Sequence, residues 1–208
     1  MSKSTYTNFH IAICRDAFQK YACAGRYPME NNGLNITEEV PPNYETWRNQ
    51  METVGAPWGW NMRPIYHTSN ELKIKEKLLS EGSRLFLLSK HDKEIGFCWA
   101  YPSTLKKALG YGHDNPGMKI ETFGLREEET NKGYGQYLAP RLLSRIFNNE
   151  SMNLIFLETR STNHNKVVPF YEKLGMEVIN MEECLPDDLI QQDGRRLVEK
   201  LPEDLTFK

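Results

Sequence analysis

The sequence contains no long uninterrupted apolar segment. Its longest apolar stretches, such as residues 85–88, are far shorter than the roughly 20 residues that a membrane-spanning helix requires. The apolar part of the N-terminal region is also short and interrupted, and no small-residue cleavage pattern follows it, so we expect a chain that is mature from its first residue. The sequence therefore predicts a soluble, cytoplasmic protein without a membrane partner.

An excess of charge of one sign is also absent. The 208 residues include 26 Lys and Arg against 28 Asp and Glu, which gives a formal net charge of -2. Proteins dedicated to nucleic-acid binding carry a basic patch or stripe, so we expect no nucleic-acid partner. The composition, with 39% hydrophobic residues, is that of an ordinary globular protein, and a single domain can accommodate this length.

Cysteines are few, and none lies in a C-x-x-C pair. They are Cys14, Cys23, Cys98 and Cys184. Because they are scattered and have no histidine at ligand spacing, neither a zinc site nor a disulfide framework is indicated. We expect no metal, and four reduced thiols that are buried or half-buried.

The spacing of apolar residues predicts alternating strands and helices. The predicted strands cover residues 9–16, 84–90, 95–102, 118–125, 153–160, 176–181 and 195–201. The predicted helices cover residues 17–27, 43–55 (capped by Asn43 and stopped by Gly55), 69–82 (with an apolar face of Leu72, Ile74, Leu78 and Leu79), 136–148 and 166–174. Residues 57–66 are expected to form an aromatic loop. This order of elements predicts a mixed α/β (α+β) fold in which helices pack on a central sheet.

A glycine-rich turn, Gly133-Tyr134-Gly135, connects a predicted strand to a predicted helix. No proline interrupts it, so every backbone amide there can donate a hydrogen bond. Unpaired amides at a helix N-terminus, the helix dipole and the adjacent Lys132 favour binding of a phosphate group. Glycine at such a turn is also common without any ligand, and this interpretation stays open. The acidic residues at 127–129 are expected to face solvent, away from any phosphate.

Two common nucleotide-binding motifs are absent. The chain lacks G-x-x-x-x-G-K-[ST], and Leu138 stands where the third glycine of G-x-G-x-x-G would be. The absence of these motifs therefore disfavours a nucleotide hydrolase and an enzyme that transfers hydride. The serines and histidines likewise show neither a nucleophile elbow nor the spacing of a metal site.

A second motif lies further along the chain, where residues 171–176 read Tyr-Glu-Lys-Leu-Gly-Met. Residues 130–135 and residues 171–176 resemble two motifs of the GNAT superfamily of acetyl-CoA dependent N-acetyltransferases, and they follow each other along the chain in the order that the family shows. The first resembles the family's [QR]-x-x-G-x-[GA] acyl-CoA loop, with Leu125 at the usual valine position. The second resembles its Y-E-K-L-G-F signature.

Three residues depart from the family pattern. Thr130 replaces the basic or amide residue, Met176 replaces phenylalanine, and Pro140 removes one hydrogen bond from the helix that follows the loop. The resemblance covers residues 70–180, and the first 70 residues show none.

The resemblance implies a GNAT-like acyl-CoA N-acyltransferase fold, with a mixed, strongly twisted sheet and helices on both faces. The sheet would open between its third-to-last pair of strands to admit acetyl-CoA. Within one domain, residues 69–180 would bind acyl-CoA, residues 1–68 would form a substrate-side segment, and residues 181–208 a C-terminal strand and tail.

The resemblance also implies a set of residues that contact acetyl-CoA, and two of them, Asn163 and Asn165, have the alternative role of helix caps. The full set is Phe123, Leu125, Thr130, Asn131, Lys132, Gly133, Tyr134, Gly135, Gln136, Asn163 and Asn165.

Acetyl transfer to an amine needs a base, an oxyanion donor and a proton donor for the departing thiolate. By resemblance, Glu121 is the candidate base, directly or through water, and Tyr171 is the candidate general acid. A backbone N–H near Leu125 is the candidate oxyanion donor. Residue types alone leave alternatives, because Glu121 could be a solvent-facing strand carboxylate and Tyr171 a core aromatic side chain.

The acceptor is expected to bind beside the N-terminal third of the chain. The candidate pocket residues, suited to an aromatic or anionic acceptor, are Trp58, Trp60, Arg63 and Tyr66. Alternatively, the tryptophans attach this loop to the core.

Together these features predict an N-acetyltransferase that moves an acetyl group directly from acetyl-CoA to a primary amine of a small molecule or peptide. Two other functions stay open. One is a non-catalytic acyl-CoA sensor or interaction module with the same fold, and the other is a scaffold whose aromatic loop binds a protein. A homodimer through residues 195–201 is compatible with the sequence, because an edge strand invites pairing.

Overall fold

The computed structural model describes residues 6–24, 33–60, 71–110, 114, 116–148, 151–161, 163 and 165–184. The strands are β1 (Tyr6–Cys14), β2 (Leu34–Glu39), β3 (Arg84–Lys90), β4 (Lys93–Ser103), β5 (Gly117–Leu125), β6 (Leu154–Arg160) and β7 (Glu177–Cys184). The helices are α1 (Arg15–Cys23), α2 (Tyr44–Gln50), α3 (Glu71–Leu78), α4 (Leu105–Leu109), α5 (Tyr134–Phe147) and α6 (Val167–Lys173), with short turns η1 (Met51–Gly55), η2 (Ala56–Trp58) and η6 (Glu127–Glu129). No helix in these ranges is long and apolar enough to cross a bilayer.

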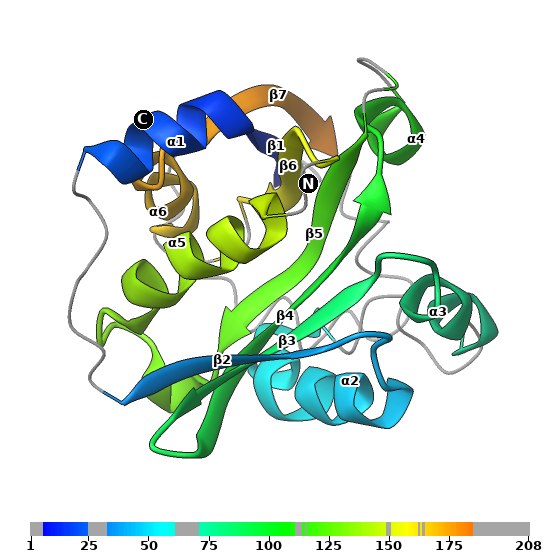
Figure 1. Ribbon diagram of the computed structural model, residues 1–208, viewed down its shortest axis with the longest axis vertical. Helices are drawn as coiled ribbons and strands as arrows, with labels where there is room; N and C mark the ends of the chain where they lie inside the picture. The colour runs from blue at the N-terminus through cyan, green and yellow to red at the C-terminus, as the bar shows by residue number, and fades with distance from the viewer. Residues whose placement is uncertain are drawn as a thin grey trace, which may run out of the picture.

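The strands form a seven-stranded sheet in the order β2-β3-β4-β5-β6-β1-β7. Neighbouring strands run antiparallel except β5 and β6, so the sheet is mixed, as predicted. Figure 1 shows α1, α5 and α6 on one face of the sheet and α2 and α3 on the other. The first helical layer covers an apolar core that includes Leu138 and Leu142, and the second covers a core that includes Trp47 and Trp99.

Asn43 caps α2 as predicted, because its Oδ1 accepts hydrogen bonds from two backbone N–H groups of the first turn at 2.8 and 3.1 Å. The prediction that Gly55 stops this helix is wrong. The chain continues through η1 and η2 to Gly59, which has a left-handed φ of 67°. Gly55 has an ordinary helical φ of -80°. Its missing side chain instead makes room for Trp60, since an added Cβ would lie 3.1 Å from the Trp60 Cβ.

The apolar pattern does not predict β2 or α4. β2 alternates buried Leu34 and Ile36 with polar residues and pairs with β3 at the edge of the sheet. α4 begins where the Thr104 hydroxyl accepts a hydrogen bond from a backbone N–H at 3.1 Å, and it ends at Gly110 with a φ of 77°. Both elements are short, so each contributes too few apolar positions to produce a recognisable period.

The predicted apolar face of the helix at 69–82 is only half correct. Ile74 and Leu78 of α3 are buried, whereas Leu72 and Leu79 are exposed. Residues four apart share a helix face, but Leu72 lies two positions from Ile74 and therefore points elsewhere. The helix also ends at Leu78, so Leu79 belongs to the following turn.

The expectation of buried or half-buried thiols is wrong for two cysteines. Cys98 is buried in β4, but Cys14 and Cys23 are exposed. Cys14 is the last residue of β1, directly before α1, and Cys23 is the last residue of α1. The predicted strand at 195–201, and with it the predicted dimer contact, lies outside the described residues.

β5 separates from β6 part-way along its length. The parallel pairing ends at Ile120 and Leu157. At the same point β5 bulges against β4: Trp99 pairs with Thr122 and the next residue of β4 pairs with Ile120, so Glu121 is the extra residue. A bulge bends the strand and increases its twist. The sheet therefore opens at the pair of strands where the resemblance implies an opening.

Replacement of Gly96 by alanine should lower the free energy of unfolding by about 2 kcal/mol or more. An added Cβ would lie 2.3 Å from the carbonyl oxygen of Gly124 and 3.0 Å from the Cα of Leu125, and this backbone cannot move without disturbing the β4–β5 pairing. Chemical denaturation measures the loss. Ser103→Ala, at the far end of β4, is the control, and an equal loss there would contradict the explanation.

Candidate active site

A cleft of about 690 Å³ lies where β5 and β6 separate. Its walls come from the second half of β5, the end of β6, the turn that leads into α5, and α6. This volume is within the usual range for small-molecule and cofactor sites. The predicted site residues that line it are Trp60, Glu121, Phe123, Leu125, Thr130, Asn131, Gly133, Tyr134, Gly135, Gln136, Asn163 and Tyr171.

The turn before α5 has the backbone conformation of a helix N-terminus that borders a ligand site. Asn131 and Gly133 have positive φ angles of 59° and 82°, which redirect the chain into α5. The backbone N–H groups of Tyr134 and Gly135 belong to the first helical turn and have no acceptor within the helix. Both residues line the cleft, so the helix dipole favours a negatively charged group there.

Lys132 does not have the position that the sequence suggests. Its Nζ lies 3.0 Å from Glu129 Oε2, and its side chain is exposed rather than part of the cleft lining. The hydrogen bond from Lys132 lowers the pKa of Glu129, which is buried. The expectation that residues 127–129 face solvent holds for Glu127 and Glu128 but is wrong for Glu129, and Glu127 lines the cleft rather than pointing away from it.

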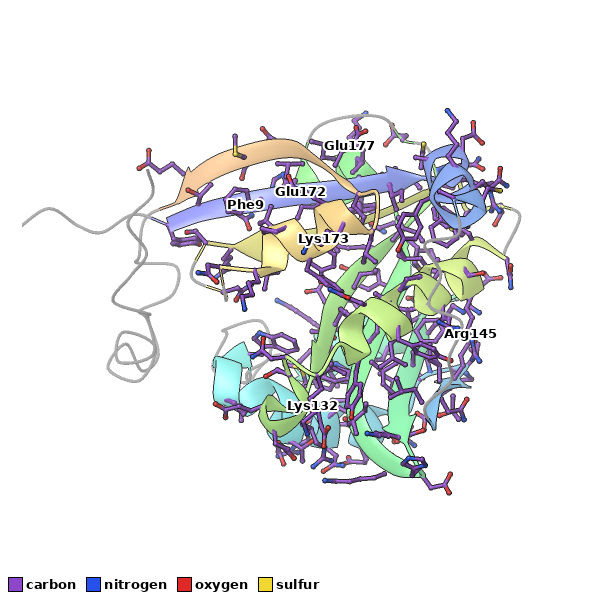
Figure 2. All side chains as sticks on the ribbon, turned by 90° about the vertical axis from the view of Figure 1, so that its left-hand side faces the viewer. Phe9, Lys132, Arg145, Glu172, Lys173 and Glu177 are labelled. Atoms are coloured by element: carbon purple, nitrogen blue, oxygen red, sulfur yellow. The ribbon has the colours of Figure 1, made fainter. Side chains whose placement is uncertain are left out.

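Two other lysines supply positive charge to the cleft. Lys166 precedes α6 and Lys173 ends it, and both line the cleft. Figure 2 labels Lys173 on α6 and Lys132 on the turn before α5. Asn165, one of the predicted cofactor contacts, is exposed next to Lys166 and does not line the cleft.

Aromatic side chains form one wall of the cleft. Phe123 of β5 stacks on Phe170 of α6 at a ring-centroid distance of 6.1 Å, and Phe170 meets Tyr171 edge-on at 5.1 Å. Tyr171 is only 8% exposed, yet it lines the cleft. Burial, with a smaller contribution from Cys98, raises the pKa of Tyr171 well above its usual value. Its hydroxyl therefore keeps its proton, as a proton donor requires.

Glu121 belongs to a buried polar network and does not face bulk solvent. Its side chain is 10% exposed, and its Oε2 accepts a hydrogen bond from the Tyr101 hydroxyl at 2.9 Å. Lys119 Nζ lies 3.3 Å from the same oxygen and 2.5 Å from Glu158 Oε1 on β6. Lys119 thus connects two carboxylates across the opening between the strands.

The pKa shifts in this network follow from burial and from neighbouring charges. Burial opposes the charged form of Lys119, but the carboxylates of Glu121 and Glu158 outweigh this effect and raise the pKa of the ammonium. Burial, and next the charge of Glu121, raise the pKa of Tyr101. Lys119 is therefore a cation and Tyr101 a neutral hydrogen-bond donor.

Trp60 both lines the cleft and packs against the core. It lines the cleft, and its ring packs edge-on against Phe97 at 6.3 Å. Gly124 permits this position, since an added Cβ would lie 2.6 Å from Trp60 Cη2. Arg63, Tyr66 and the Trp58 side chain lie outside the described residues.

Asn163 lines the cleft at the end of β6, where its side chain is held in place. Its Nδ2 donates a hydrogen bond to Thr159 Oγ1 at 2.8 Å, and its backbone N–H donates to the Arg160 carbonyl at 2.9 Å. Thr122, next to Glu121, is 4% exposed, and its Oγ1 has no hydrogen-bond partner among the described residues.

Sequence reasoning missed the partners of Glu121. Lys119 is two residues before Glu121 on β5, and this alternation was a local signal for a shared face. Tyr101 and Glu158 come from neighbouring strands, so only the registers of β4 with β5 and of β5 with β6 bring them into contact. The bulge at Glu121 shifts one of these registers and has no sequence signature here.

Comparison with known proteins bears directly on this architecture. Residues 43–176, the larger part of the chain, match the model of the acetyltransferase (GNAT) family. The chain belongs to this family. The predicted superfamily and the predicted fold are both confirmed, and GNAT acetyltransferases are acyltransferases. No curated protein matches the sequence at a significant level.

Solved structures support the same fold at low sequence identity. The aminoglycoside acetyltransferase meta-AAC0020 from an uncultured soil metagenomic sample, in complex with sisomicin, is 12% identical with a TM-score of 0.51 and aligns over 69% of this chain and 88% of its own. A tandem GNAT protein from the clavulanic acid biosynthesis pathway is 13% identical with a TM-score of 0.56, over 86% of this chain and 54% of its own. A functionally unknown protein from Staphylococcus epidermidis is 11% identical with a TM-score of 0.53, over 86% and 60%. The chain thus spans less than two thirds of the last two proteins.

Lys119→Met should lower the free energy of unfolding at neutral pH by about 3 kcal/mol, because Glu121 and Glu158 would lose the ammonium that they share. The pKa of Lys119 is raised above 10.5 in the folded protein. Its stabilising contribution is therefore complete below the unfolded-state pKa and is lost as the pH rises through the folded-state pKa.

Denaturation at about pH 8 and about pH 11 tests this pH dependence. The difference in free energy of unfolding between wild type and Lys119→Met should be smaller at the higher pH. Lys106→Met is the matched control. Its ion pair with Asp114 is exposed, so its loss should cost less than about 0.5 kcal/mol. A pH-independent difference for Lys119→Met would contradict the role assigned to its charge.

Proposed function

We propose that this GNAT-family protein transfers an acetyl group directly from acetyl-CoA to a primary amine of a small molecule or peptide. One observation carries the proposal: a single cleft is lined by the N-terminus of α5, by the buried carboxylate of Glu121 and by the hydroxyl-bearing Tyr171. These are an anion-binding element, a proton acceptor and a proton donor, which are the groups that amine acylation requires.

The residues of the cleft fit acetyl-CoA. The amides of Tyr134 and Gly135, with Lys166 and Lys173, suit its phosphate groups. Beyond Ile120 the β6-facing edge of β5 has lost its strand partner, so its peptide groups are available to the amides of the pantetheine arm. When bound, acetyl-CoA supplies the acetyl group as a thioester whose thiolate is the leaving group.

Glu121 is assigned the task of receiving the proton of the acceptor amine. An alkylammonium has a pKa of about 10, so at neutral pH the nitrogen must lose a proton before or during attack. Glu121 lines the cleft at the bulge of β5 and can accept this proton directly or through a water molecule. Backbone N–H groups of β5 near Leu125 are assigned to the developing oxyanion.

Tyr171 is assigned the task of donating a proton to the departing thiolate. Its raised pKa keeps the phenol protonated, and its packing against Phe170 fixes the direction of the ring. We place the acceptor beside Trp60, in line with a substrate-side role for the N-terminal segment. Because one solved relative is an aminoglycoside acetyltransferase, small-molecule amines are the first acceptors to test.

A non-catalytic acyl-CoA sensor is the second candidate function. The observation that favours it is the engagement of Glu121, whose Oε2 already receives the Tyr101 hydroxyl and the Lys119 ammonium. A carboxylate held in this way could be structural. Release of free thiol from acetyl-CoA across a panel of amines distinguishes the two functions, since a sensor binds the cofactor without releasing thiol.

Acetyl-CoA should raise the melting temperature of the protein, with about 2.7 kcal/mol of added stability at a hundredfold excess over its Kd. Lys173→Ala should weaken this binding by about fivefold, because Lys173 lines the cleft. Lys132→Ala is the matched control and should leave the affinity unchanged, because its ammonium is paired with Glu129 outside the cleft. No thermal shift at millimolar acetyl-CoA would refute cofactor binding.

Tyr171→Phe should lower kcat by about a hundredfold, which is a typical loss for a general acid. The Kd for CoA should change little, because the ring and its packing remain. Steady-state kinetics with thiol detection and calorimetry with CoA measure the two quantities. Tyr137→Phe, a buried tyrosine of α5 outside this cleft, is the control. Equal losses in the two variants would contradict the assigned role.

A further inference from the structure

Glu121 and Glu158 share one ammonium group, that of Lys119. The three side chains are 10%, 31% and 13% exposed, respectively, so solvent screens them only in part. Both carboxylates line the cleft, whereas Lys119 is not among its lining residues. A ligand in the cleft therefore meets the two carboxylates and not the ammonium that connects them.

Glu158 is the member of this group that is most accessible to a ligand. Its Oε1 contacts Lys119 at 2.5 Å, and its Oε2 accepts a hydrogen bond from Asn8 Nδ2 at 3.2 Å. Each carboxylate oxygen can accept about two hydrogen bonds, so both oxygens retain capacity. Arg160, two residues further along β6, holds its guanidinium 5.1 Å from the centre of the Tyr6 ring and forms no ion pair with Glu158 in the described part of the chain.

Thr122 is an independent sign that a polar group binds here. Its Oγ1 is buried and has no hydrogen-bond partner among the described residues, and Thr122 lines the cleft next to Glu121. A buried hydroxyl without a partner costs free energy, which a ligand donor would recover.

Acetyl transfer requires the attacking nitrogen of the acceptor and any second amino group to be in different protonation states. The attacking nitrogen must be neutral, whereas an amino group that takes no part in the attack stays protonated near neutral pH and is stabilised by a carboxylate. Glu121, at the bulge of β5, is assigned to the attacking amine, so the more exposed Glu158 on β6 is suited to another amino group of the same molecule, one that stays charged throughout.

We propose that Glu158 and Thr122 form a subsite for a second, protonated amino group, so that the acceptor is a diamine or polyamine. The identity of the ligand as an acceptor rests on the proposed function. The recognition of a second ammonium by this chain does not, because it can be measured without any transfer.

Calorimetry tests the subsite directly, with unbranched diamines of increasing length against the monoamines of the same length, in the absence of acetyl-CoA. For wild type, the best diamine should bind about tenfold tighter than its monoamine, and added salt should reduce this ratio. Glu158→Gln should remove the preference, while Lys119 keeps Glu121 as its partner. Glu158→Asp retains the negative charge and should therefore keep part of the preference for the diamine.

Glu172→Gln is the matched control, since it removes one carboxylate from the exposed side of α6 outside the cleft and should leave the preference intact (Figure 2). Equal affinities of wild type for monoamines and diamines, or a preference that survives in Glu158→Gln, would overturn the subsite. Diamine binding without thiol release would instead refute the proposed transfer and leave the subsite standing. Thiol release that is equally efficient with monoamines and diamines would instead refute the subsite and leave the proposed transfer standing.

Discussion

The separation of β5 from β6 beyond Ile120 is the constraint on which the candidate site depends. On its other edge β5 stays paired with β4, and the missing side chain of Gly96 leaves room for the Gly124 carbonyl. The bulge at Glu121 lets β5 bend away from β6 while this pairing continues. One strand therefore serves as a core element on one side and as a binding surface on the other.

A nearly neutral chain conceals a strong local separation of charge. Lys166 and Lys173 place positive charge on the α6 wall of the cleft, whereas Glu121 and Glu158 place carboxylates where the strands part. Lys132, the cation closest in sequence to the glycine-rich turn, is neutralised by Glu129. The position and ion-pair partner of each charged side chain in the fold determine which charges are available to a ligand.

Local periodicity predicts the mixed sheet, the resemblance carried by two contiguous motifs implies its opening, and most of the residues that these motifs single out line the cleft. The sequence does not predict β2, whose two buried apolar residues are too few to show a period. It also mistakes Lys132 for a cleft residue, since proximity in sequence does not determine where a long side chain finds its partner. The contacts of Glu121 with Tyr101 and Glu158 depend on strand register, which only the folded chain determines.

The sheet is divided into two antiparallel parts, β2-β3-β4-β5 and β6-β1-β7, and the strand pairing that joins them in the described ranges is the short parallel one that ends at Ile120 and Leu157. A bound molecule in the cleft would contact both parts at once. It would then connect the two parts, and its binding free energy would be added to the free energy that holds them together. Amide groups on both sides of the cleft would exchange their hydrogens more slowly as a result, although most of them would not touch the ligand.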